Sequence, residues 1–236
     1  MVAAARQLHR RRGRVESGKF LLEGPHAVGD ALIAGFPLET VFTLEGDVAD
    51  YGEARVVTVT HQVVARIATT TTPQAPIAVA VIPESVIPKS GDLLVAWGVG
   101  DPGNVGTLIR TAAAFGFGFV CGPGTADPWS PKVVRAAAGA SFRTAIGSAA
   151  TIEELRAGGR RVLAAVTSGG DLPVRGPEAI ALLVGSEAHG LADDVVEAAD
   201  LLVTIPMVAG SESLNAAVAG SILAYALRGY ANRSRA

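Results

Sequence analysis

Polar side chains that could orient a reacting group follow three apolar segments in the C-terminal part of the chain. They come after DLLVAW, IALLVG and LLVTIP, and they comprise Asn104, Arg110, Glu187, Ser213 and Asn215. If the three segments are parallel strands, their carboxyl ends open onto one crevice, where α/β proteins usually bind ligands. The sequence therefore predicts that these five side chains converge on one pocket.

A glycine spacing in the first of these stretches suggests a different chemistry. Gly98, Gly100 and Gly103 fit the dinucleotide-binding pattern G-x-G-x-x-G, which also needs an acidic residue about 20 positions later to hold a ribose. The next strand ends FGFVCGPG, and the first acid after Gly103 is Asp127. Pro102 lacks the backbone N–H that a pyrophosphate would require at this turn. A nicotinamide- or flavin-dependent oxidoreductase therefore ranks last among the candidate functions.

Several of the polar residues have simpler interpretations. Arg110 lies in GTLIRTAAAFG, a helical stretch that is otherwise apolar and small, and a structural ion pair could hold it there. Ser213 could serve only as a helix N-cap. Gly185 and Gly190 would let a backbone approach a ligand closely, with the carboxylate of Glu187 beside it. The residues alone leave both ligand-binding and structural roles open.

Alternating strands and helices carry these residues. Strands are expected at DLLVAW, FGFV, RTAIG, RVLAAV, AIALLVG and LLVTIP, and helices at about 105–115, 130–139, 151–157, 192–199 and 213–229. Apolar strands that alternate with helices indicate an α/β fold with a parallel sheet covered on both faces. The sequence predicts this domain over residues 91–236.

A smaller α/β unit is expected to precede it, over residues 1–82. Its expected strands are FLLEG, ETVFTL, RVVTV and PIAVAVI, and its expected helices are PHAVGDALIAG and THQVVARIA. The segment PESVIPKSG contains two prolines and predicts a linker at 83–90. The threonine run Thr69–Thr72 is expected in a surface turn.

The start of this unit is basic. Residues 1–19 contain six Lys or Arg and one acid, although the whole chain has a net charge of −2. Basic runs commonly contact phosphate backbones, so Arg10, Arg11, Arg12 and Arg14 are candidate nucleic-acid-binding residues. A solvated helix face explains the same pattern equally well.

The composition limits the class of protein. The single cysteine, Cys121, excludes an internal disulfide, and no apolar run approaches the ~20 residues that would span a bilayer. The basic N-terminal residues are not followed by the apolar segment of a signal peptide. The sequence predicts a cytoplasmic protein with no membrane association and no metal site.

The three polar stretches, in order and spacing, resemble a known family. DPGNVGTLIRTAAAFG, LLVGSEAHGL and IPMVAGSESLNAAVAGSILAYAL are similar to the three motifs of the SpoU-type (TrmH family) RNA ribose 2′-O-methyltransferases of the SPOUT superfamily. SPKVVRAAAGASF, residues 130–142, resembles the family's sequence between the first and second motifs. RRRGRVESGKFLLEGPHAVGDAL looks like the small ribosomal-protein-like RNA-binding domain that many members carry. The resemblance implies that such a domain precedes a SPOUT domain with a deep trefoil knot.

The resemblance also implies an activity and its site. The expected reaction is S-adenosylmethionine-dependent methylation of a ribose 2′-hydroxyl in structured RNA by a homodimer, with rRNA favoured over tRNA as the substrate. The loop 206–212 and the helix after it would line the cofactor crevice. Cofactor contacts would come mainly from the backbone, at Gly185, Ile205 and Leu214. The catalytic residues would be Asn104, Arg110, Glu187, Ser213 and Asn215, and the RNA-binding residues Arg10, Arg11, Arg12 and Arg14.

Three points stay open at this level. Arg110 is the family's usual candidate for accepting the hydroxyl proton, but an arginine ordinarily keeps its own proton, so a clamp on the neighbouring phosphate and ribose is an equal alternative. His189 is not required by the second motif, and a surface or packing role is expected for it. A non-catalytic RNA-binding or ribosome-assembly protein could retain the same fold, although the intact set of polar residues argues against it.

Overall fold

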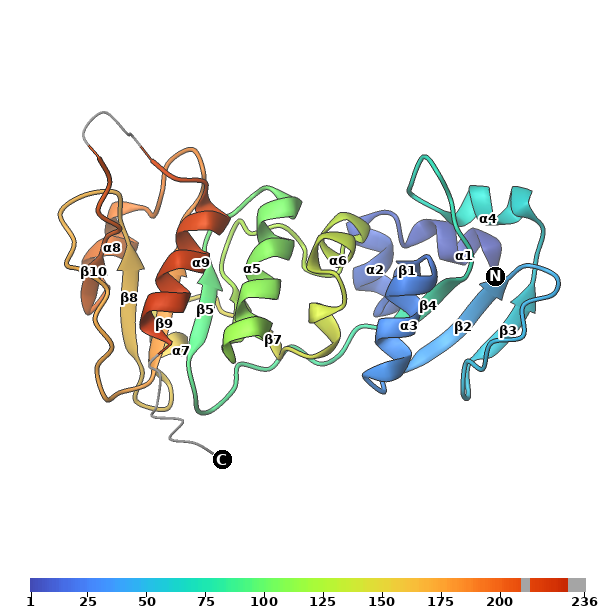
Figure 1. Ribbon diagram of the computed structural model, residues 1–236, viewed down its shortest axis with the longest axis horizontal. Helices are drawn as coiled ribbons and strands as arrows, with labels where there is room; N and C mark the ends of the chain where they lie inside the picture. Colours follow the sequence, from blue (N-terminus) through green and yellow to red (C-terminus); the bar gives the residue numbers. More distant parts are fainter. Residues whose placement is uncertain (209–212, 229–236) are drawn as a thin grey trace. The chain divides into compact units, whose positions relative to one another are not determined.

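The computed structural model describes residues 1–208 and 213–228. The chain divides into two compact units (Figure 1): Met1–Glu84 with Asp127–Arg143, and Ser85–Ala126 with Thr144–Ala236. The first boundary falls inside the expected linker. The sequence predicts a continuous C-terminal domain over 91–236, whereas the structure assigns its segment 127–143 to the first unit.

Aromatic packing explains why the segment 127–143 belongs to the first unit. The ring of Trp129 lies 4.8 Å from that of Phe20, and the ring of Phe142 lies 5.1 Å from that of Phe36, centroid to centroid. Phe20 is fully buried and Trp129 is nearly so. Large rings of this kind dominate the energetics of a small core. The segment therefore completes an apolar core that residues 1–82 do not close by themselves.

The first unit is built on a mixed sheet with the strand order β1-β4-β2-β3. Its strands are β1 (Lys19–Glu23), β2 (Leu38–Thr43), β3 (Arg55–Thr58) and β4 (Ile77–Val81), and its helices are α1 (Val2–Gln7), α2 (Arg11–Ser17), α3 (Pro25–Ile33), α4 (His61–Ile67) and α6 (Pro131–Ala137). β4 runs antiparallel to both β1 and β2, and β3 runs parallel to β2. The expected strands and helices of this unit are confirmed.

The two faces of this sheet bury different side chains. Leu21 of β1 joins a core with Leu8, which follows α1, and with Ile67 of α4. Its neighbour Phe20 points to the other face, because successive strand residues alternate, and packs there with Phe36 and Trp129. A four-stranded sheet covered on both faces results.

Residues 85–91 pack within the second unit and are not a free linker. The side chain of Arg160, of which only 3% is exposed, donates hydrogen bonds to the carbonyl oxygens of Pro88 and Gly91. Burial lowers the pKa of Arg160. Because a buried guanidinium needs such acceptors, it ties this segment to the start of β8 (Arg161–Ala165).

The second unit is built on a six-stranded sheet with the order β10-β8-β9-β5-β6-β7. Besides β8 its strands are β5 (Leu93–Ala96), β6 (Gly118–Cys121), β7 (Ile146–Ser148), β9 (Ile180–Val184) and β10 (Leu201–Val203), and its helices are α5 (Pro102–Phe115), α7 (Ile152–Arg156), α8 (Asp193–Glu197) and α9 (Ala216–Leu227). Every strand pair is parallel. The predicted parallel sheet is confirmed.

Helices α5 and α9 lie side by side over one face of this sheet (Figure 1). Gly220 sets how closely α9 approaches. A Cβ atom at this position would lie 2.6 Å from Leu108 of α5 and 3.0 Å from Val184 of β9. Gly220 therefore allows α9 to pack tightly against α5 and β9 within this subunit.

The other face of the sheet packs against α7 and α8. Ile152 and Leu155 of α7 and Val195 of α8 form one core with inward-facing strand residues such as Leu93 and Leu183. The sheet is thus buried on both faces, which explains why its strands are almost uninterruptedly apolar.

One structural prediction for the C-terminal third stays untested, and one observation concerns all the described helices. The trefoil knot depends on the path of the loop 206–212, of which 209–212 lie outside the described residues, so the knot stays a prediction. Among the helices that the structure describes, none is long and apolar enough to cross a membrane.

Candidate functional site

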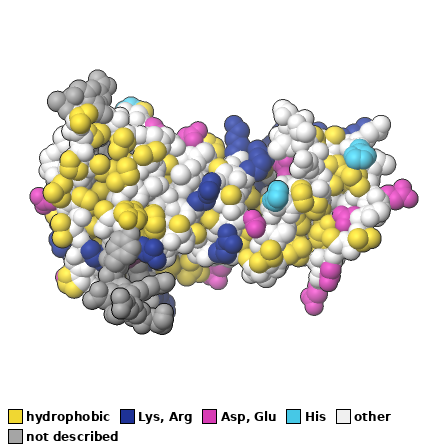
Figure 2. Space-filling model, viewed as in Figure 1, with side chains coloured by type: hydrophobic (Ala, Val, Ile, Leu, Met, Phe, Trp, Pro, Cys, Tyr) yellow, Lys and Arg dark blue, Asp and Glu magenta, His cyan; other side chains and the backbone are white. Residues whose placement is uncertain are grey.

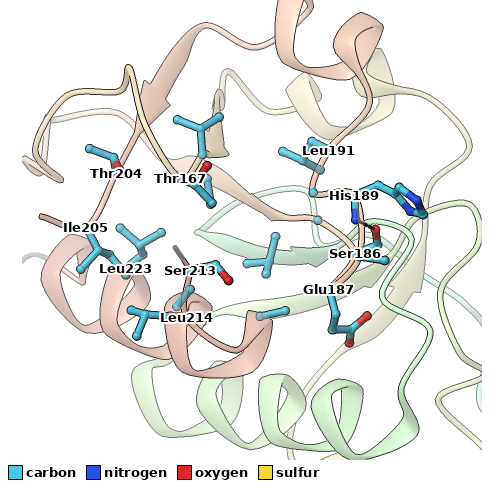
Figure 3. Close-up of a pocket in the computed structure, with 18 of the residues that line it drawn as sticks. Thr167, Ser186, Glu187, His189, Leu191, Thr204, Ile205, Ser213, Leu214 and Leu223 are labelled. Carbon is cyan, nitrogen blue, oxygen red and sulfur yellow. Dashed lines mark hydrogen bonds between the residues drawn. The ribbon is translucent and has the colours of Figure 1, made fainter. Parts of the chain in front are cut away.

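A pocket of about 420 Å³ opens at the carboxyl ends of β8, β9 and β10 in the second unit (Figure 3). Its lining contains all three residues predicted to hold a cofactor, Gly185, Ile205 and Leu214. Glu187 and Ser213, two of the predicted catalytic residues, also line it. The end of β9 at residues 185–187 therefore meets Ile205, Ser213 and Leu214 at this pocket.

The β9 loop of the pocket is a tight hairpin. Ser186 and Gly190 exchange two backbone hydrogen bonds of 2.9 Å each. A Cβ atom on Gly185 would lie 2.3 Å from the carbonyl carbon of Gly190, so only glycine fits at this position. The sequence assigned this glycine to close approach of a ligand, and the structure shows close approach of its own loop. The hairpin fixes the direction in which Glu187 leaves the strand.

The loop between β5 and α5 uses its glycines for a different purpose from dinucleotide binding. Gly98 has a φ of +74°, a conformation that favours glycine. Asp101 caps α5 by accepting a 2.9 Å hydrogen bond from the backbone N–H of Asn104. A Cβ atom on Gly103 would lie 2.9 Å from the Asp101 carboxylate, so Gly103 makes room for this cap. These roles explain Gly98 and Gly103 without a pyrophosphate.

A chain of hydrogen bonds connects the three polar stretches beside the pocket. The side-chain amide of Asn215 donates to Oδ1 of Asn104 at 3.0 Å, and the amide of Asn104 donates to Oε1 of Glu187 at 2.6 Å. The side-chain oxygen Oδ1 of Asn215 caps α9 by accepting from the N–H groups of Ala217 and Val218. Each amide thus uses its oxygen and its nitrogen for different partners. An Asp at position 104 would instead place a second carboxylate against Glu187.

Arg110 and Ser213 do not take part in this series of hydrogen bonds. Arg110 is exposed just under two turns further along α5, roughly 9 Å along the helix axis from Asn104. No hydrogen bond or ion pair of its side chain occurs within the described residues, so the structural ion pair considered from the sequence is absent there. Ser213 precedes the helix start, and Asn215 takes the N-cap position.

Sequence reasoning missed several pocket residues. Thr167 follows β8 and Thr204 follows β10, and both face the cavity in Figure 3. A polar residue directly after an apolar strand, followed in the case of Thr167 by Gly169 and Gly170, was the available signal. His189 also lines the pocket and is exposed at its rim, where its backbone N–H donates to the hydroxyl of Ser186.

The basic segment 10–14 of the first unit does not present all its arginines to solvent. Arg14 is only 3% exposed. Its guanidinium donates to Asp127 at 2.5 and 2.9 Å and to the carbonyl oxygens of Leu8 and His9. Because these partners occupy the guanidinium, the assignment of Arg14 to RNA binding is corrected to a structural role.

The neighbouring arginines remain available at the surface. Arg10, Arg11 and Arg12 are all exposed. Arg12 forms a 2.6 Å ion pair with Glu16, one turn along α2. Arg10 and Arg11 are therefore the least compensated positive charges of the segment. Figure 2 shows the Lys and Arg side chains of the viewed face in several separate groups.

Within the described part of the chain, no group of three or more His, Cys, Asp or Glu side chains is placed to hold a metal ion.

Comparison with known proteins identifies the family. The sequence profile of the SpoU rRNA methylase family matches residues 92–225, and that of the MRM3-like substrate-binding domain matches residues 1–78. The chain belongs to the SpoU rRNA methylase family. It is similar to the 23S rRNA (guanosine(2553)-2′-O)-methyltransferase RlmP of Bacillus subtilis strain 168, with 34% identity over 95% of this chain and 94% of the relative.

Solved structures agree with this assignment. An AdoMet-bound rRNA methyltransferase from Sinorhizobium meliloti is 31% identical and superposes with a TM-score of 0.85, covering 95% of this chain and 92% of the other. A TrmH-family structure from Porphyromonas gingivalis is 34% identical, also with a TM-score of 0.85, over 96% of both chains. The predicted family and fold class are confirmed.

Proposed function

We propose that this protein methylates a ribose 2′-hydroxyl of ribosomal RNA with S-adenosylmethionine as the methyl donor. The observation that carries the proposal is the hydrogen-bonded chain Asn215–Asn104–Glu187 at the edge of the pocket. It joins three stretches that are far apart in sequence, beside a cavity that lies at the strand ends. The relatives named for rRNA methylation support the same reaction.

The pocket has the size and chemistry to hold S-adenosylmethionine. Pockets for molecules of this size measure about 300–1,000 Å³ and combine apolar walls with a few polar groups. Here Leu191 and Leu223 supply apolar surface, and Thr167, Thr204 and Ser213 supply hydroxyls. When bound, the cofactor supplies an electrophilic sulfonium methyl group. We assign its binding to the pocket backbone at Gly185, Ile205 and Leu214.

The polar chain would hold the reacting groups in place. With Asn104 fixed between two partners, the free acceptor capacity of Glu187 is directed by the hairpin of β9. A ribose hydroxyl near this carboxylate and Ser213 would be oriented for attack, and orientation of this kind supplies much of the acceleration in a transfer reaction. With the cofactor bound, transfer would join O2′ to the methyl carbon as the carbon–sulfur bond breaks and its electron pair stays on sulfur, and the hydroxyl proton would pass to solvent.

Arg110 would act on the RNA side of the site. Its exposed guanidinium has five N–H donors and no partner among the described residues. A fork of donors suits a bidentate contact with phosphate. We therefore favour the clamp over the proton acceptor, and we propose that Arg110 contacts the phosphate beside the target ribose.

The first unit would hold the RNA. Its match to a substrate-binding domain agrees with this role, and Arg10, Arg11 and Arg12 are exposed on or beside α2. Among RNA classes we favour rRNA, because the Bacillus relative that matches nearly the whole chain is named for 23S rRNA. An enzyme with this substrate works where ribosomes are assembled, which we propose is the cytoplasm.

We further propose a homodimer formed through α9. Val218, Ile222 and Tyr225 are 46%, 41% and 53% exposed, and Leu214 just before the helix is 37% exposed. Their spacing places them on one face, opposite the residues that pack on the sheet. Sedimentation of the wild type and of Ile222→Glu tests this, with a dimer expected for the first and a monomer for the second.

Methyl transfer from labelled S-adenosylmethionine to total RNA tests the proposed reaction. We expect labelled rRNA, and alkali-resistant linkages at the modified nucleotide, because a 2′-O-methyl group blocks attack on the neighbouring phosphate. The nucleotide equivalent to the guanosine named for the Bacillus relative is the first position to map. A wild-type protein that binds RNA but transfers no methyl would instead support the non-catalytic alternative.

A further inference from the structure

We propose that Thr125 is a positioning residue for methyl transfer, through its hold on the loop that precedes Asn104. Thr125 lies after β6, outside the three motifs and outside the pocket lining. Its hydroxyl donates to the carbonyl oxygen of Ala96 at 2.7 Å and accepts from the backbone N–H of Gly98 at 3.2 Å. The inference rests on the proposed function, because it concerns the same site.

The segment that carries Thr125 forms hydrogen bonds at three points with the end of β5 and the loop between β5 and α5. Besides the threonine hydroxyl, the N–H of Gly122 donates to the carbonyl of Ala96 at 2.8 Å, and the N–H of Ala126 donates to the carbonyl of Val99 at 2.9 Å. The two backbone bonds hold the ends of the loop. The hydroxyl alone reaches its centre, where Gly98 adopts the left-handed conformation.

The centre of this loop controls the geometry of the polar chain. From Gly98 the backbone continues to Asp101, whose carboxylate caps α5 at the N–H of Asn104. A Cβ atom on Gly98 would lie 3.8 Å from Cβ of Ser186, so the same turn borders the hairpin that carries Glu187. A shift at Gly98 would therefore move the Asn104 amide relative to the carboxylate that it contacts at 2.6 Å.

Loss of the hydroxyl should affect turnover more than binding. Thr125→Val keeps the shape of the side chain but leaves the N–H of Gly98 without its acceptor and the carbonyl of Ala96 with one donor fewer. Misplacement of a reacting group by about 1 Å can cost roughly 100-fold in rate. For a smaller displacement we expect kcat to fall about tenfold, with S-adenosylmethionine and RNA affinities within about twofold of the wild type. Thr125→Ser, which retains the hydroxyl, should restore kcat.

Thr151→Val is the matched control, because the Thr151 hydroxyl caps α7 on the opposite face of the sheet. It removes one threonine hydroxyl from the same unit and should leave kcat unchanged. Equal loss of kcat in both variants, or unchanged kcat in Thr125→Val, would overturn the proposal.

Hydrogen–deuterium exchange separates this inference from the proposed function. In Thr125→Val we expect the amides of residues 98–104 to exchange at least tenfold faster, while those of strands β2 and β3 in the first unit keep their rates. If the wild type transfers no methyl, the proposed function fails, and exchange alone decides on Thr125. Unchanged exchange at 98–104 would overturn the positioning role.

Discussion

Helices α2 and α5 each contain an arginine whose role the sequence left ambiguous. One of the two is buried and has a structural role, and the other is exposed and available to a ligand. Arg14 of α2 belongs to a basic run, yet it is buried against Asp127 and two carbonyl groups. Arg110 of α5 stands alone in an apolar stretch, yet it is exposed and has no partner among the described residues. A local density of charge therefore did not indicate which cation is available to a ligand.

The sequence did not distinguish the two arginines because an ion-pair partner can lie far away along the chain. Arg14 meets Asp127 across 113 residues, a contact that a helical pattern cannot reveal. Arg110 has no carboxylate three or four residues away, and its helix is covered by α9 on another side. The contrast predicts that stability depends on the first arginine and activity on the second.

Removal of Arg14 should have the largest effect of the changes considered. Arg14→Ala leaves the carboxylate of Asp127 in a site where only 17% of its side chain is exposed, and it removes the donors to two carbonyls. Breaking a buried pair in this way typically costs about 3–5 kcal/mol. Urea denaturation should show this loss in the free energy of unfolding.

Arg12→Ala provides the control for that measurement. Arg12 lies in the same helix and also has an acidic partner, but 87% of its side chain is exposed. Exposed i, i+4 pairs contribute about 0.3–0.5 kcal/mol, so its unfolding should hardly change. Similar losses for both variants would remove the distinction between the two arginines.

Removal of Arg110 should affect catalysis and leave stability unchanged. If the guanidinium clamps a phosphate, Arg110→Ala should lower kcat/KM roughly 100-fold, which corresponds to about 2.7 kcal/mol. Arg110→Lys keeps the charge but loses the planar fork, and it should recover part of the activity. Methyl-transfer kinetics over a range of pH measure both effects.

The two variants also distinguish a clamp from a proton acceptor. Loss of a clamp lowers the rate by a similar factor at every pH, whereas loss of a proton acceptor makes the rate rise with hydroxide concentration. Near-normal turnover in both variants would remove Arg110 from either role.

The sequence predicted the parallel sheet and the meeting of three strand ends because both follow from local patterns. Uninterrupted apolar strands identify buried β-structure, and the direction of parallel strands brings residues 185–187 close to Ile205 and Leu214. Capping by Asp101 and the role of Gly103 depend on neighbours along the chain and were in principle accessible.

Contacts between distant segments were not accessible in the same way. Nothing in the pattern of 127–143 indicates that Trp129 and Phe142 complete the core of the first unit. The hydrogen bonds from Asn215 to Asn104 and from Asn104 to Glu187 depend on side-chain orientations that a pattern of residue types does not determine. The family resemblance identified these residues, and the structure shows which of them are hydrogen-bonded to one another.

The exposed arginines of the basic segment should contribute less than Arg110, because each makes one phosphate contact among several. Arg10→Glu and Arg11→Glu should each weaken RNA binding roughly tenfold and lower the slope of affinity against salt by about one. Lys89→Glu, an exposed change in the second unit, is the control. Filter binding at several salt concentrations measures this, and unchanged slopes would show that the segment is only a solvated surface.

The smallest expected effect concerns Asp200, whose ion pair with Arg156 is the exposed counterpart of the buried pair of Arg14. Burial opposes ionisation of Asp200, but the N–H of Val162 at 2.7 Å and the guanidinium of Arg156 at 3.0 Å outweigh it and hold the pKa of the carboxyl below its ordinary value. A depressed carboxyl pKa adds stability above the pKa of the unfolded chain, about 3.9, and the contribution disappears as pH falls through the folded value.

Asp200→Asn isolates that charge, because the asparagine oxygen can still accept from Val162. A third of the Asp200 side chain is exposed, so solvent screening should keep the difference from wild type below about 1 kcal/mol at pH 7. Urea unfolding at pH 7 and pH 3 should show the difference shrinking at the lower pH, and 1 M salt should reduce it at pH 7. If the difference in the free energy of unfolding grew on acidification, the folded protein would stabilise the protonated form of Asp200. The contribution of Asp200 would then come from hydrogen bonding and not from its charge, and the comparison with the buried pair of Arg14 would no longer be one between two ion pairs.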